Sequence, residues 1–166
     1  MRTSLAAPQG DHLFLESARI EEGLAASRKS RRGRMIVPLQ RSEDAPVQRM
    51  LNVLQPGSYI RPHLHPRPQA AELVCVLQGA LGVFLFGEAG QVTQSRRLQP
   101  GASQSILDLE AKVWHTFVAL EADTVVLEVK GGPYDRAQDK LWPEWAPAES
   151  SPEAGRYLES LLARLP

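Results

Sequence analysis

The chain has 166 residues, a length that fits one domain with its own hydrophobic core. Its 19 Lys and Arg residues balance its 19 Asp and Glu residues, so no whole-chain charge favours nucleic acid or an anionic membrane as a partner. With 43% hydrophobic and 23% charged residues, the composition excludes a wholly disordered chain.

Cysteine content and hydropathy narrow the class of protein further. A single cysteine, Cys75, excludes an internal disulfide framework and a cysteine-rich zinc module. Residues 1–23 contain no apolar run typical of a signal peptide, and no stretch approaches the roughly 18 apolar residues of a membrane-spanning helix. We therefore expect a soluble, cytoplasmic protein without membrane insertion.

The N-terminal segment, residues 1–34, is expected to hold a helix and a basic linker. Apolar residues recur near helical spacing and predict a helix over residues 12–27. Residues 28–34 (RKSRRGR) contain five basic side chains. A solvated linker is the more common explanation of such a run, and a phosphate-binding patch is the alternative.

Residues 35–130 contain short apolar runs separated by turn residues such as Pro56-Gly57 and Pro100-Gly101. Many short strands at roughly even spacing predict an all-β sandwich or barrel. Alternating strands and long helices are absent, which argues against a Rossmann or TIM architecture. The runs are MIVPL, QRMLNVL, SYIRPHLH, AELVCVL, ALGVFLF, QVTQSRRL, SILDLE, VWHTFVAL and TVVLEVK.

The C-terminal segment, residues 131–166, begins with Gly131-Gly132-Pro133 and contains several further prolines. This composition predicts an irregular wrap around the domain. A short amphipathic helix is expected after it, over about residues 152–164.

Three of the four histidines lie in the predicted β region. His63 and His65 are two residues apart in a predicted strand, so both imidazoles point to the same face. Glu72 begins the next strand, and His115 lies in a later one. Neutral imidazoles and a carboxylate suit one divalent ion, with zinc, iron(II), manganese and nickel all possible. The alternative is a solvated strand face with an exposed carboxylate.

The order and spacing of these residues resemble the two cupin motifs. The resemblance implies a single cupin jelly-roll β-barrel with one divalent transition metal inside, bound by the three histidines and the glutamate. The residues that carry it are Gly57, His63, His65, Glu72 and Gly79 for the first motif, and His115 for the second.

More closely, the chain resembles the WbuC-type cupin fold metalloproteins. That family is associated with bacterial O-antigen and lipopolysaccharide gene clusters, and its reaction is not established. Small cupins often pair through sheet edges, so a homodimer is expected by analogy. The matching stretches are residues 47–52, 56–63, 114–116 and 127–135, extended by 139–140 and 145–147.

Two features depart from the usual cupin pattern. Six residues separate His65 from Glu72, more than in a typical cupin, so this loop has to bulge to return Glu72 to the metal. The usual Pro-x-Gly turn before the last histidine is replaced by residues 110–112 (Glu-Ala-Lys).

Other polar residues are candidates for binding or catalysis. Tyr59 and Arg61 share the face of His63 if the strand is straight, and are substrate-binding candidates; packing at the barrel mouth is the alternative. Glu128 is a candidate general base if burial raises its pKa, and pairing with Lys130 or Arg49 is the alternative. Cys75 has the opposite parity to Glu72 and is expected to point away from the site.

Three functions are compatible with this sequence. The first is a metal-dependent enzyme of isomerase, lyase or oxygenase type that acts on a small polar or sugar-like substrate. The second is a non-catalytic metal-binding sensor or accessory module of a biosynthetic pathway. The third, a cupin with vestigial ligands, is disfavoured because three histidines and a glutamate are all present. An open coordination position would favour the enzyme, and a sealed site the module.

Overall fold

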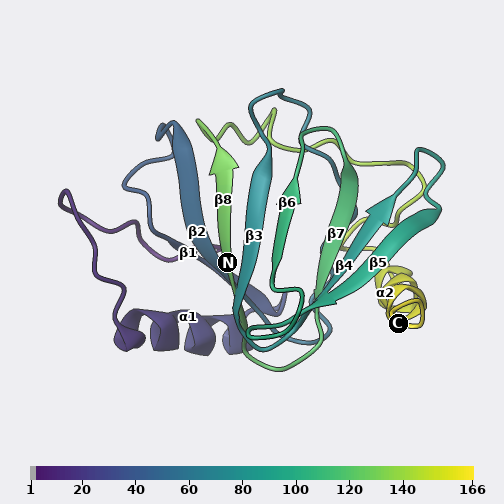
Figure 1. Cartoon of the computed structure of the whole chain (residues 1–166), viewed down its shortest axis with the longest axis horizontal. Helices are drawn as coiled ribbons and strands as arrows, with labels where there is room; N and C mark the ends of the chain where they lie inside the picture. Colours follow the sequence, from purple (N-terminus) through teal and green to yellow (C-terminus); the bar gives the residue numbers. More distant parts are fainter. Residues whose placement is uncertain (1–2) are drawn as a thin grey trace.

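The computed structural model describes residues 3–166, which form two antiparallel β-sheets and a helix near each end of the chain (Figure 1). The predicted all-β fold class with short N- and C-terminal helices is confirmed. The elements are α1 (Ser17–Lys29), β1 (Arg34–Pro38), β2 (Val47–Leu54), β3 (Glu72–Gln78), β4 (Leu81–Phe86), β5 (Val92–Leu98), β6 (Ile106–Leu109), β7 (Trp114–Ala119), β8 (Thr124–Gly131) and α2 (Ala154–Leu162).

The larger sheet has the strand order β1-β2-β8-β3-β6, and the smaller has the order β5-β4-β7. Their facing sides bury one apolar core, as in a β-sandwich. This inter-sheet core consists of Leu54, Val74, Val76, Leu81, Val83, Leu98, Phe117, Ala119 and Val126.

The two helices cover the outer faces of the sheets. On the larger sheet, α1 packs Leu24 against Val37 and Val53 of β1 and β2. On the smaller sheet, Phe84 of β4 packs in a cluster with Leu158 of α2. Strand β4 is therefore buried on both faces, which explains why its sequence is apolar without alternation.

Most predicted strands are present, with one exception. The run at residues 58–65 is not a strand, and it pairs only through isolated bridges of His63 with His115 and of Leu64 with Leu141. Pro62 and Pro66 have no N–H to donate, so a regular ladder is interrupted on both sides of the histidines.

The N-terminal helix is shorter than predicted at its start. It begins at Ser17 rather than at residue 12. Leu13 and Leu15, which the apolar spacing assigned to the helix, are 39% and 37% exposed. A helix over these residues would therefore have little apolar surface to bury there, and helices of this length depend on tertiary packing.

A C-terminal strap, residues 132–147, crosses one end of both sheets on its way to α2, at the top of Figure 1. Lys130 Nζ at the end of β8 donates to Asp139 Oδ1 over 2.6 Å, and both side chains are nine-tenths or more buried. Leu141 pairs with Leu64 through two backbone hydrogen bonds of 2.9 and 3.3 Å. The strap is thus fixed against the histidine loop.

Within the described residues 3–166, no helix is both long and apolar enough to cross a membrane.

We expect Gly131→Ala to destabilise the fold and to disturb the loop before Glu72. A Cβ at Gly131 would lie 1.6 Å from the carbonyl oxygen of Gln69, so the loop backbone would have to move. The expected loss is about 1–3 kcal/mol or more in the free energy of unfolding, measured by urea denaturation. Gly155→Ala is the matched control, because its Cβ meets nothing within 4 Å. It should be neutral or stabilising by up to about 1 kcal/mol. Equal stability of the two variants would contradict the close approach of Gly131 to the carbonyl oxygen of Gln69.

The ion pair between Lys130 and Asp139 should make the free energy of unfolding of the metal-free protein fall at acid pH. Burial alone would raise the pKa of Asp139, but its interactions with His65 and Lys130 bring it below the usual 3.8. The stabilisation from this carboxylate is therefore present above pH 3.8 and lost as the pH falls below it. We expect Asp139→Asn to lower stability at pH 7 by about 3–5 kcal/mol and to flatten this part of the pH profile.

The control for this measurement is Asp108→Asn. Asp108 is exposed, and none of its contacts within residues 3–166 is a side-chain hydrogen bond or ion pair. Acid unfolding that is as steep in Asp139→Asn as in the Asp108→Asn control would show that Asp139 does not carry the effect.

Candidate metal centre

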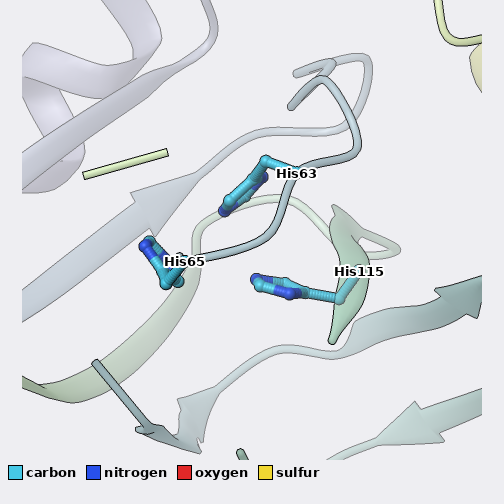
Figure 2. A group of neighbouring side chains, drawn as sticks. All are labelled: His63, His65 and His115. Atoms are coloured by element: carbon cyan, nitrogen blue, oxygen red, sulfur yellow. The ribbon is translucent and has the colours of Figure 1, made fainter. Parts of the chain in front are cut away.

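Three histidine side chains meet inside one end of the sandwich. His63 and His65 come from the loop between β2 and β3, and His115 comes from β7 (Figure 2). One nitrogen from each ring lies within 4.8 Å of the others. The three residues are only 3%, 3% and 1% exposed. Because the bridge between His63 and His115 is a pair of backbone hydrogen bonds, of 3.0 and 2.9 Å, the loop is held directly against β7.

The three rings are oriented by the same kind of contact. Each Nδ1 lies within hydrogen-bond distance of a backbone carbonyl oxygen, which only accepts. The neutral tautomer that fits is therefore the one in which Nδ1–H donates and the lone pair is on Nε2. The contacts are His63 Nδ1 to Arg61 O, 2.9 Å; His65 Nδ1 to Asp139 O, 2.6 Å; and His115 Nδ1 to Val113 O, 2.8 Å.

Glu72 brings its carboxylate to the Nε2 side of two of these rings. Its Oε1 lies 3.1 Å from His115 Nε2, and its Oε2 lies 3.3 Å from His65 Nε2. Glu72 Oε1 and His115 Nε2 are buried without a hydrogen-bond partner in residues 3–166. With the protons on Nδ1, lone pairs of nitrogen and oxygen face each other. Such an arrangement is costly unless a cation lies between them, so these residues fit a metal ion.

The long loop between His65 and Glu72 returns to the site through a turn. Ala70 N–H donates to Arg67 O over 3.0 Å, and Gly131 N–H donates to Ala71 O over 3.3 Å. Glu72 then enters β3 opposite Lys130 of β8. The turn absorbs the additional residues, so the departure from the usual spacing leaves Glu72 beside the histidines.

Burial and local charges set the protonation of these groups. Burial and the nearby charge of Lys140 lower the pKa of His63 well below its usual value, which keeps that imidazole neutral. Burial alone would raise the pKa of Glu72, but in the metal-free protein positive charge and donation from His115 and His65, whenever those rings are protonated on Nε2, hold it well below the usual range. Burial alone would lower the pKa of His65, but its hydrogen bonds with Asp139 and Glu72 raise it. A neutral imidazole and an ionised carboxylate are the forms that bind metals.

A second layer of polar residues lies on the inner face of the larger sheet. Alternation along β8 places Glu128 and Lys130 on the face that carries Val126 of the core. Asn52 of β2 donates its Nδ2–H to Glu128 Oε2. Burial and the negative charge of Glu72 raise the pKa of Glu128. A carboxyl group with a raised pKa therefore lies near the histidines.

Tyr59 and Arg61, the predicted substrate-binding residues, each donate a hydrogen bond to a backbone carbonyl of the C-terminal strap. Tyr59 donates its hydroxyl hydrogen to Pro147 O over 2.9 Å and packs against Tyr157, in the cluster under α2. Arg61 donates to Pro143 O, and its guanidinium carbon is 5.8 Å from the ring centre of Trp142. The parity argument that grouped them with His63 does not apply, because this segment is not a strand. Cys75 is half-buried on the face of β3 opposite Glu72, as the alternation predicts.

Sequence reasoning gave no role to the strap residues near the histidines. Asp139 holds His65 through its carbonyl oxygen. The ring centre of Trp142 is 5.6 Å from that of His63, and Lys140 Nζ is 5.9 Å from the Trp142 ring centre. For Asp139 and Lys140 the only signal in the sequence was the resemblance, which extended over residues 139–140, and Trp142 was expected only to pack.

Solved structures similar to this chain include cupin proteins. Oxalate decarboxylase from Bacillus subtilis is 19% identical with a TM-score of 0.47, over 58% of this chain and 24% of its own; that enzyme has Mn(II) centres. KdgF from Halomonas sp. is 26% identical with a TM-score of 0.44, over 57% of this chain and 77% of its own. A recombinant oxalate oxidase is 19% identical with a TM-score of 0.45, over 58% and 46%.

These likenesses assign no activity to this chain. The chain spans only about a quarter of the length of the oxalate decarboxylase. A search of curated proteins gives no match.

A family model matches residues 15–98, which include α1, His63, His65 and Glu72. The model is not that of the WbuC-type proteins, so that closer resemblance stays a prediction. The matched residues cover half of the sequence, and the chain belongs to the family described as a domain of unknown function, DUF6016.

Proposed function

We propose that the protein is a divalent-metal-binding cupin enzyme, in which His63, His65, His115 and Glu72 bind the ion. The observation that carries this proposal is the set of buried lone pairs that face one another, above all Glu72 Oε1 opposite His115 Nε2 at 3.1 Å. A structural polar cluster would place a proton between each such pair. Here the backbone carbonyls already accept from Nδ1, so a proton between each such pair would require a charged imidazolium in the buried interior.

Three imidazole nitrogens and one carboxylate oxygen suit zinc, iron(II), manganese and nickel. When bound, such an ion supplies Lewis-acid chemistry or a water of lowered pKa. Four protein donors leave room for a further ligand on an ion that takes five or six. The substrate class expected from the sequence is a small polar or sugar-like molecule.

Glu128 is the residue best suited to move a proton at this site. It is close enough to Glu72 for that charge to raise its pKa, and Asn52 binds one of its oxygens. A carboxylate with a raised pKa is a stronger base than an ordinary one, which suits it to accept a proton from substrate. Asn52 fixes the orientation of the carboxyl group, and the second oxygen is the one available to substrate.

The second candidate function, a non-catalytic metal-binding module, is favoured by the burial of the centre. No residue of the proposed ligand set is more than 3% exposed. The strap and Trp142 cover the histidines on the outer side. A closed site is typical of structural metals, and an open position is typical of catalysis.

The cellular context and the assembly are further proposals. The link to O-antigen biosynthesis and a cytoplasmic location rest on the sequence alone. A homodimer is supported by an uncovered apolar area on the outer face of β3 and β6, where Leu73, Leu77 and Ile106 are 36%, 44% and 56% exposed. Burial of such side chains is a common reason for association.

Elemental analysis of the purified, untagged protein tests the metal proposal. We expect about one equivalent of a divalent transition metal per chain, because the donors form one cluster. His63→Ala and His115→Ala should each lose most of it, and Glu72→Gln should weaken binding by at least about tenfold, because a neutral amide replaces a charged oxygen ligand.

His12→Ala is the matched control, because His12 is exposed and far from the centre in the sequence. It should keep the full metal content. A folded wild-type protein that takes up no metal even after its addition would exclude the proposal.

The open coordination position is tested with cobalt(II)-loaded protein and azide. An enzyme should bind azide at the free position and change its visible absorption spectrum, because the new ligand alters the coordination. A spectrum that stays unchanged up to high azide concentration would favour the binding module. Zinc-loaded protein, which has no such absorption, provides the blank.

A further inference from the structure

Two cationic side chains gather beside His63 on the strap side of the centre. Arg61 Cζ lies 5.8 Å and Lys140 Nζ lies 5.9 Å from the ring centre of Trp142, and this ring is 5.6 Å from that of His63. Cations at these distances are attracted to the face of an indole ring. Trp142 therefore holds two positive charges next to the proposed metal ligands.

The backbone fixes the position of Lys140 from both sides. The preceding residue, Asp139, binds His65 through its carbonyl oxygen and Lys130 through its carboxylate. The following residue, Leu141, pairs with Leu64. The backbone on both sides of Lys140 is thus fixed against the loop that carries His63 and His65.

These half-buried cations have no ion-pair partner within residues 3–166, although Arg61 donates one hydrogen bond to Pro143 O. Within residues 3–166, Lys140 Nζ makes no hydrogen bond or ion pair, whereas Lys130 Nζ is 2.6 Å from Asp139 Oδ1. Arg61 Nε is buried and also has no partner there. Burial and the charge of Lys130 lower the pKa of Lys140. An unpaired cationic donor in such a place costs free energy that a bound anion would recover.

With a divalent ion bound, the charges around the centre leave an excess of positive charge. Asp139 neutralises Lys130, and Glu72 faces the histidines. Glu128 makes no ion pair within 4.0 Å of Lys140 or Arg61 among the described residues, and one of its oxygens is bound by Asn52. Lys140 and Arg61 therefore have no carboxylate of the described residues within ion-pair distance.

We propose that Lys140 and Arg61 form an anion-binding pair beside the metal centre, and that the ligand of this protein carries a carboxylate or a similar negative group. The inference rests on the proposed function and specifies its substrate class as a small hydroxy acid or sugar acid. A neutral analogue would leave both cations unpaired, so the site discriminates against it. Lys140 is a substrate-binding residue in this assignment.

Calorimetric titration with charged and neutral ligands of matched size tests the proposal. The pairs are lactate with lactamide and glucuronate with glucose, each added to metal-loaded and to metal-free protein. We expect each acid to bind wild-type protein at least about tenfold more tightly than its neutral partner, because charge-assisted hydrogen bonds are the stronger ones. Lys140→Gln should remove most of this preference, and Lys140→Arg should retain it.

Lys29→Gln is the matched control, because Lys29 is an exposed residue at the end of α1. It should bind both acids as the wild type does. Equal affinity for acid and neutral partner, no binding of either acid, or an unchanged preference in Lys140→Gln would each overturn the anion-binding pair.

Metal content, measured on the same samples, separates this inference from the proposed function. A protein that binds metal but shows no acid preference keeps its function as a metal-binding cupin and loses the anion site. A protein that binds no metal loses the proposed function. The acid preference of the metal-free form then still decides the role of Lys140.

Discussion

The convergence of lone pairs in a dry interior is the constraint on which the rest of this structure depends. Three Nε2 atoms and a carboxylate lie together where almost no water reaches them. Their orientation is imposed by backbone carbonyls of Arg61, Asp139 and Val113, which belong to three separate segments of the chain. The loop, the strap and the approach to β7 are therefore held in one arrangement, because a change in any of them rotates an imidazole away from the centre.

The same alternation of side chains that builds the core also builds the polar site. Along β3 and β8, Val74, Val76 and Val126 face the inter-sheet core. A few residues further along the same face, Glu72, Glu128 and Lys130 replace them. The sandwich is thus apolar at one end and ionic at the other, and the strap supplies Asp139 where the charge of Lys130 has to be balanced.

One fold can host many chemistries, so the fold alone assigns no reaction. The residues around the histidine cluster therefore carry the proposals made for this chain. Trp142 with Arg61 and Lys140 forms the outer side of the centre, and Glu128 with Asn52 lies on the inner sheet. The residues proposed for ligand selectivity and for proton transfer therefore come from different segments, the strap and the inner face of the larger sheet.

The sequence by itself determined the strand-rich fold, because apolar runs and turn residues are local signals, and it identified His63, His65, Glu72 and His115 as a group. It misjudged the conformation of residues 58–65, since prolines prevent a ladder there, and it placed Leu13 and Leu15 in a helix that has nothing to pack them against. Only the tertiary structure decided that Tyr59 packs under α2, and that Asp139, Lys140 and Trp142 reach the histidines. These contacts join residues more than seventy positions apart in the sequence. Periodicity reports only local structure, whereas the path of an irregular segment depends on the tertiary contacts that it makes.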